Sequence, residues 1–134
     1  MRLLLDTHIV IWTLVDDGRL PGEARLLIED EGNEILCSVA SSWEVAIKHA
    51  AHPDKMLMGA SEFMDYCEAS GFSQLPISSR HVRALETIER PVDVAPHNDP
   101  FDRIMLAQAK ADGLLLLTHD AHIVEYGESC VLRV

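Results

Sequence analysis

Five short apolar runs divide the chain, and Gly, Asn, Asp or Ser residues bound them. Each run has the length of a β-strand. Their apolar character is largely unbroken rather than alternating, which is typical of strands covered on both faces in a parallel sheet. We therefore predict strands over Arg2–Leu5, Ile35–Val39, Phe72–Ile77, Leu114–Thr118 and Cys130–Val134.

Helical patterns fill the segments between these runs. Trp43, Ala46, Ile47 and Ala50 recur at helical spacing and form one apolar stripe. Another helix is expected to begin at Pro100, which suits the first helical position, and to end at Gly113. Further elements are expected as helices over Thr7–Val15, Pro21–Asp30, Ser61–Ser70 and Val82–Ile88, and as a turn over His49–Met58.

Strands that alternate with helices form βα units with right-handed crossovers. The predicted fold class is therefore α/β, a three-layer α/β/α sandwich around a central parallel sheet of about five strands. The 134 residues suit one compact domain spanning 1–134.

Five acidic residues follow or precede the predicted strands in a way that places them at one edge of the sheet. Asp6 ends the first strand, Glu44 follows the second, and Asp120 follows the fourth. Asp99 and Asp102 open the helix that begins at Pro100, and such helices start at the carboxyl edge, where α/β sheets bind ligands. Converging carboxylates repel one another unless a cation is present. Oxygen ligands without His or Cys in ligand spacing favour Mg²⁺ or Mn²⁺.

Each acid also has a structural interpretation. Ser41 and Glu44 match a helix capping box, and Asp99 is placed to cap the helix at Pro100. Asp6 and Asp120 would each favour a helix N-terminus. These interpretations explain the acids one at a time. They do not explain why all of them meet at one rim.

The net charge of the chain bears on whether it can bind nucleic acid. A net charge of −11 counts against non-specific nucleic-acid binding unless the acids surround bound cations. His8, His97 and His119 each lie near a candidate acid and are candidate phosphate contacts. The basic residues available to position RNA are Lys48, Arg80, Arg83, Arg90, Arg103 and Lys110, of which Arg103 is also expected to pair with Asp102.

Scattered cysteines and the lack of a long apolar segment bear on location. The three cysteines are widely separated, which suits a reducing cytosol better than a disulfide framework. No segment approaches the ~20 apolar residues of a membrane helix. A cytoplasmic location is expected.

Three motifs, LLLDTHIVIW, SSWEVAIK and DPFDRIMLAQAKADGLLLLTHD, occur in this order between Arg2 and about Ile123. Together they resemble the VapC-type PIN-domain ribonuclease toxins of type II toxin–antitoxin systems. The resemblance implies an Mg²⁺- or Mn²⁺-dependent endoribonuclease, a small antitoxin partner and a homodimer. Carried over by motif, the catalytic and metal-binding acids are Asp6, Glu44, Asp102 and Asp120. Asp99 is a fifth acid that either binds metal or caps a helix, and Thr118 and Arg103 are candidate substrate contacts.

The sequence departs from the family pattern at AAHPDKML, where many relatives carry a short Gly-Lys-Leu. The shape of this loop, and with it the fit to substrate or partner, is therefore expected to differ from theirs.

Two other classes of protein share some of these features. A Mg²⁺-dependent phosphotransfer signalling module needs an acceptor Asp at the end of a middle strand, where this chain has Ser38-Val39 and Ile77-Ser78. A phosphatase of the DxD type needs a second Asp, which Asp6-Thr7-His8 lacks. A third alternative is a catalytically silent PIN-like binding scaffold. An RNA cleavage assay with Mn²⁺ and EDTA distinguishes this scaffold from an enzyme.

Overall fold

Five strands, all parallel, form one sheet in the order β3-β2-β1-β4-β5 in the computed structural model, which describes residues 1–134. The strands are β1 (Arg2–Leu5), β2 (Glu34–Ser38), β3 (Ser73–Leu75), β4 (Leu115–Thr118) and β5 (Val131–Arg133). The predicted parallel five-stranded α/β fold is confirmed. β3 and β5 are shorter than predicted, since each pairs with its single neighbour over only three residues.

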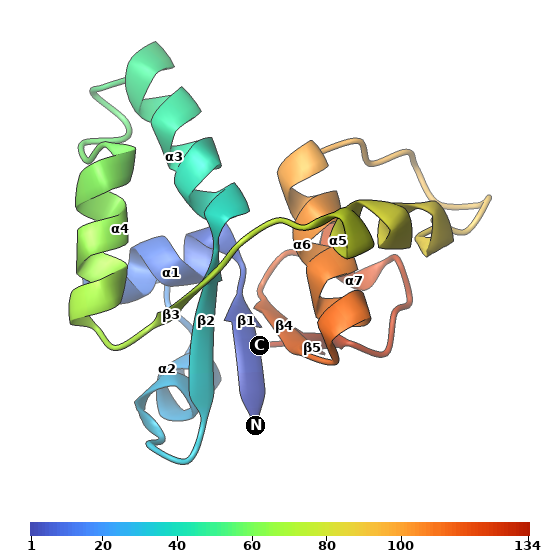
Figure 1. Cartoon of the computed structure of the whole chain (residues 1–134), viewed down its shortest axis with the longest axis horizontal. Coiled ribbons are helices and arrows are strands. Elements are labelled where there is room, and N and C mark those ends of the chain that lie inside the picture. The colour runs from blue at the N-terminus through green and yellow to red at the C-terminus, as the bar shows by residue number, and fades with distance from the viewer.

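Helices cover both faces of the sheet (Figure 1). They are α1 (Thr7–Leu14), α2 (Gly22–Glu29), α3 (Val39–Ala51), α4 (Ala60–Ala69), α5 (Ser79–Ala84), the 3₁₀ helix η1 (Leu85–Thr87), α6 (Pro100–Asp112) and α7 (Ala121–Val124). α6 begins at Pro100 and ends before Gly113, whose φ of 66° is left-handed, as predicted. None of the helices has both the length and the apolar character that a membrane crossing requires.

Two hydrophobic cores lie on opposite faces of the sheet, because successive side chains of a strand point to opposite sides. Leu4 of β1 and its neighbour Leu36 face α6, where they pack in a cluster with Met105. Leu3 and Leu5 face the other way and pack in a second cluster with residues of α1, α2 and α4. The three layers visible in Figure 1 follow from this alternation.

Three details of the helices differ from the sequence-based expectation. α3 continues through Ala51, so the expected turn over His49–Met58 begins only at His52. The segment around Val82–Ile88 forms α5 and η1 rather than one helix, and Val82 is exposed.

The apolar stripe of α3 faces outward. Trp43 is 58% exposed and Ile47 is 47% exposed. The buried side of α3 instead carries Ser41, Glu44 and Val45. Ser41 bonds to Thr7, and Val45 packs in the second hydrophobic cluster.

Candidate functional site

Asp6 lies at the centre of the carboxyl edge, directly after β1. Its backbone N–H donates to the carbonyl of Leu117 at 3.0 Å, which extends the β1–β4 pairing by one residue. The side chain is 3% exposed, and its Oδ2 accepts a 2.9 Å hydrogen bond from the hydroxyl of Thr118. Burial raises the pKa of Asp6 to about 6, although the bond from Thr118 acts in the opposite direction.

Thr118 joins two of the candidate acids. Its hydroxyl donates to Asp6 and accepts from the backbone N–H of Asp120 at 3.0 Å. The residue is fully buried, so the hydroxyl is not available to a substrate. The expected substrate contact at Thr118 is therefore replaced by a positioning role for both acids.

Thr118→Val is expected to destabilise the protein by about 1–2 kcal/mol, because a buried carboxyl and a backbone N–H lose their partner. The pKa of Asp6 should rise further above about 6. Urea denaturation measures the first effect, and Thr118→Ser, which keeps the hydroxyl, serves as the control. Equal loss of stability in both variants would contradict the role assigned to the hydrogen bonds.

Asp102, in the first turn of α6, shows how closely the acids gather. Its pKa is raised to about 8, first by burial and then by the negative charges of Asp6, Asp99, Asp120 and Glu44. A charge has such an effect only over several ångströms. The structure therefore brings together all five acids that the sequence singled out, from β1, α3, α6 and the end of β4.

Glu44 points to the site from the buried side of α3. The predicted capping box with Ser41 is wrong, because Ser38 caps this helix and the hydroxyl of Ser41 bonds to Thr7 at 2.8 Å instead. One oxygen of Glu44, Oε2, pairs with the ammonium of Lys48 at 2.9 Å. The other, Oε1, is buried without any hydrogen-bond partner. A buried carboxylate oxygen left unpaired is costly, and a bound cation would satisfy it.

Asp99 and Asp120 both cap helices. Asp99 Oδ1 accepts from the backbone N–H groups of Phe101 and Asp102 at 2.9 and 3.1 Å, which supports the capping interpretation for this residue. Asp120 Oδ1 accepts from the N–H of His122 at 2.8 Å. In both, Oδ2 takes no partner in the protein.

The acids combine fixed and free oxygens. Glu44, Asp99 and Asp120 each hold one oxygen on a protein partner and leave the other free. No three Asp, Glu, His or Cys side chains are already arranged as a complete metal-binding group. The donor set nevertheless fits a hard divalent cation, since it consists of carboxylate oxygens that repel one another in its absence.

His97 adds a neutral neighbour to Asp102. Its Nε2 lies 3.2 Å from Asp102 Oδ2, and its Nδ1 lies 3.0 Å from the hydroxyl of Tyr126. Burial and then the charge of Arg90 lower the pKa of His97, which keeps the imidazole neutral at pH 7. The sequence indicated His97 only as a candidate phosphate contact, two residues before Asp99.

Arg103 does not pair with Asp102, so that expectation is wrong. Its guanidinium lies over the ring of Tyr126, 5.8 Å from the centroid, and one of its nitrogens is 3.4 Å from the Tyr126 hydroxyl. The helix turns Arg103 away from its neighbour in sequence and towards α7. This leaves the carboxyl of Asp102 free of any cationic partner.

A buried polar layer beneath the acids was not predicted. Thr7 and Ser41 share a hydrogen bond of 2.8 Å that ties α1 to α3, and Ser38 donates to Gln108 of α6 at 2.6 Å. All four side chains are almost completely buried. Each is an ordinary polar residue in a helical or strand pattern, so only its spatial neighbours reveal that it fixes the elements that carry the acids.

Comparison with known proteins agrees with this architecture. Residues 3–129 match the model of the PIN domain family. The fold is similar to a chain of the VapBC2 complex from Rickettsia felis bound to a DNA fragment from its promoter, at a TM-score of 0.68 and 14% identity, covering 100% of this chain and 98% of that one. It is also similar to a chain of a toxin–antitoxin complex from Klebsiella pneumoniae, at a TM-score of 0.58 and 21% identity, covering 97% and 95%. No curated protein matches the sequence. The match over almost the whole length confirms the family that the three motifs resembled, and the chain belongs to the PIN domain family.

Proposed function

We propose that the protein is an endoribonuclease that depends on Mg²⁺ or Mn²⁺ and acts as the toxin of a toxin–antitoxin pair. The observation that carries this proposal is the gathering of Asp6, Glu44, Asp99 and Asp120 around Asp102, where their charges add to the effect of burial and raise its pKa to about 8. Such a concentration of like charge is unfavourable in the protein alone and becomes favourable around a cation. A nuclease that acts through bound metal ions needs such a cluster of carboxylates, whereas a helix cap needs one acid only.

The proposed ligands are Asp6, Asp102 and Asp120, with Glu44 and Asp99 contributing their free oxygens. A divalent cation held there would supply Lewis-acid activation of water and would offset the charge that develops on a phosphodiester. The chain itself supplies the positioning. Thr118 orients Asp6 through a 2.9 Å hydrogen bond, and the capping bonds fix Asp99 and Asp120 at helix N-termini.

An antitoxin partner and a homodimer are parts of the same proposal. The two similar structures named above come from toxin–antitoxin complexes, which supports a protein partner. The exposed side chains of Trp43 and Ile47 on α3 supply apolar surface for such contacts. The cluster of acids suits a partner that brings basic side chains. Both the partner and the RNA would be encountered in the cytoplasm.

Cleavage of a mixed RNA substrate with Mn²⁺ is the direct test. We expect the purified protein to cleave RNA with Mn²⁺ or Mg²⁺ and to lose this activity in EDTA, because the acids then have no cation to hold. Fragment ends, read by sequencing, report the preferred site. Cleavage that persists in EDTA would refute the metal-dependent mechanism, and a protein that binds RNA without cutting it would be the silent scaffold instead.

A further inference from the structure

A pocket lined by cationic and aromatic side chains opens beside the acids. It measures about 360 Å³ and lies between α1 and the segment that joins α3 to α4. We refer to it as the cationic pocket, and its polar and aromatic lining includes Trp12, Arg19, Lys48, His52 and Lys55.

The cationic pocket shares a wall with the site. A smaller pocket of about 260 Å³ contains Asp6 and Asp120, and His8, Trp12 and Arg19 line both. Lys48 of the cationic pocket also contacts one of the candidate acids, since its ammonium pairs with Glu44. A ligand that lies over the acids therefore extends into the cationic pocket.

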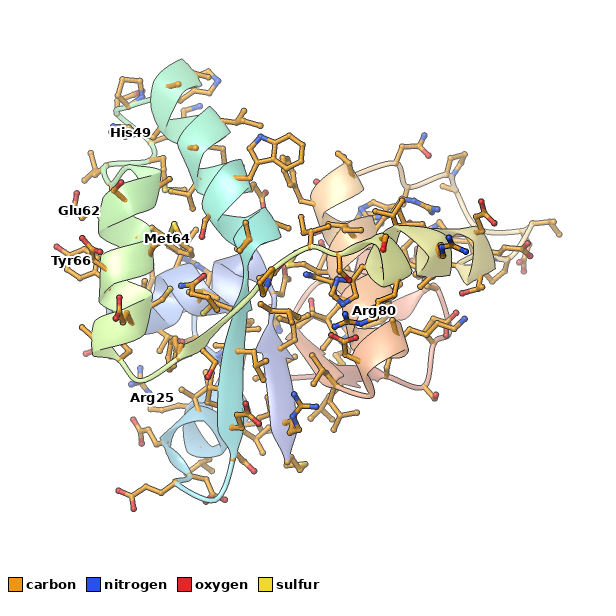
Figure 2. All side chains as sticks on the ribbon, in the orientation of Figure 1. Arg25, His49, Glu62, Met64, Tyr66 and Arg80 are labelled. Carbon is orange, nitrogen blue, oxygen red and sulfur yellow. The ribbon has the colours of Figure 1, made fainter.

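The placement of these cations is unusual for a chain with a net charge of −11. Three of its 11 Lys and Arg residues line this one pocket. Lys55 has no acidic partner, and so its charge is available to a ligand. Arg80, Arg90 and Lys110, which the sequence offered for RNA binding, instead form ion pairs with Asp112, Glu125 and Glu128. Arg80 lies on the side of the sheet that carries α5 and α6 (Figure 2). The cationic pocket thus brings the free charge of Lys55, and the paired charges of Arg19 and Lys48, next to the acids.

Trp12 gives the pocket an aromatic surface. Its ring is partly exposed between His8 and His119, with centroid distances of 5.8 and 6.2 Å. The guanidinium of Arg19 lies 5.5 Å from the ring centroid, but its side chain is 72% exposed and is held only by Asp17. Such an arginine can move aside or can itself stack on an incoming ring.

We propose that the cationic pocket binds the nucleotide next to the phosphate that lies over the acids, with its base against Trp12 and its phosphate at Lys55. This inference rests on the proposed nuclease function. Aromatic rings interleaved with cations are the combination that holds single-stranded nucleic acid. An acidic peptide would use the cations but would gain little from the ring. His52 and Lys55 belong to the segment AAHPDKML, which runs from the end of α3 into the loop before α4.

The test measures binding without cleavage. A labelled single-stranded oligoribonucleotide is titrated in EDTA, and its fluorescence anisotropy reports the affinity. Trp12→Leu is expected to weaken binding by about tenfold, because one base loses its stacking surface. Lys55→Gln should reduce the slope of log K against log salt by about 0.7 for a single strand. Arg2→Gln, which removes an exposed cation at the opposite edge of the sheet, is the matched control and should change neither quantity.

The outcomes separate this inference from the nuclease proposal. Binding that depends on Trp12 and Lys55 supports the pocket even if no variant or wild type cleaves RNA, a result that would overturn the nuclease proposal alone. Equal effects of Lys55→Gln and Arg2→Gln would overturn the pocket. A second result would also overturn the pocket as a nucleotide site. If a Glu-rich peptide bound the wild type and the oligonucleotide did not, the occupant would be a protein partner. Circular dichroism confirms that each variant is folded.

Discussion

Asp102→Asn is expected to lower Mn²⁺-dependent RNA cleavage by roughly a thousandfold. Asp102 is the acid on which the charges of the other four act, and its substitution removes both a proposed metal ligand and the centre of the negative field. Asn keeps the size of the side chain and the start of α6. Lost activity would therefore reflect the chemistry of the site and not its shape.

Initial rates of cleavage of one defined RNA, measured over a range of Mn²⁺ concentrations, check this expectation. Asp65→Asn is the matched control, because Asp65 is exposed on α4 and forms no ion pair. It should cleave as the wild type does. An Asp102→Asn protein with wild-type rates would remove Asp102 from the mechanism. Rates restored by high Mn²⁺ would indicate that only cation affinity was lost.

The second large effect concerns stability in the absence of metal. The carboxyl of Asp102 has a pKa of about 8 in the folded protein, against an ordinary value of 3.8. At pH values between about 4 and 8, the carboxyl of Asp102 has lost its proton in the unfolded chain but keeps it in the folded protein. The folded state then binds more protons, so stability falls as the pH rises from about 4 to 8. Asp6 adds to this fall in stability between pH 3.8 and about pH 6, because its pKa is also raised in the folded protein.

The size of this fall is expected to reach several kcal/mol, at about 1.4 kcal/mol for each unit of pKa difference. Urea denaturation in EDTA at a series of pH values measures it. Asp102→Asn should be more stable than the wild type near pH 8 and should show a flatter profile, because its amide does not titrate. Asp65→Asn should follow the wild type. Parallel profiles for the wild type and Asp102→Asn would show that the acids do not repel one another.

Much of the fold could be predicted from the sequence because the strands are buried on both faces. Unbroken apolar runs such as Leu3–Leu5 mark these strands directly, and parallel strands place their carboxyl ends at one edge. The meeting of Asp6 with Asp102 and Asp120 follows from that geometry alone. Pro100 and Gly113 likewise marked the ends of α6 through local backbone preferences.

The remaining features depend on contacts between distant parts of the chain. The bond from Thr118 to Asp6 joins residues 112 positions apart, and no local pattern records it. Ser41 matched a capping box, but its hydroxyl found Thr7 after the helices had packed. The stripe that contains Trp43 was correctly assigned to a helix, yet periodicity does not reveal which side of a helix will be covered. Arg103 was paired with its sequence neighbour, although adjacent helical residues point in different directions.

The central position of β1 has a consequence for synthesis of the protein on the ribosome. β1 is made first, but one of its two partners in the sheet, β4, is made nearly last. Asp6 is fixed by Leu117 and Thr118, so it waits for more than four-fifths of the polypeptide to be translated before its surroundings exist. Contacts of such long sequence separation slow folding, because the entropy of closing the loop between them is lost before they form. The nascent chain thus carries its first acid from the start, but the residues that fix this acid follow only when β4 has been made.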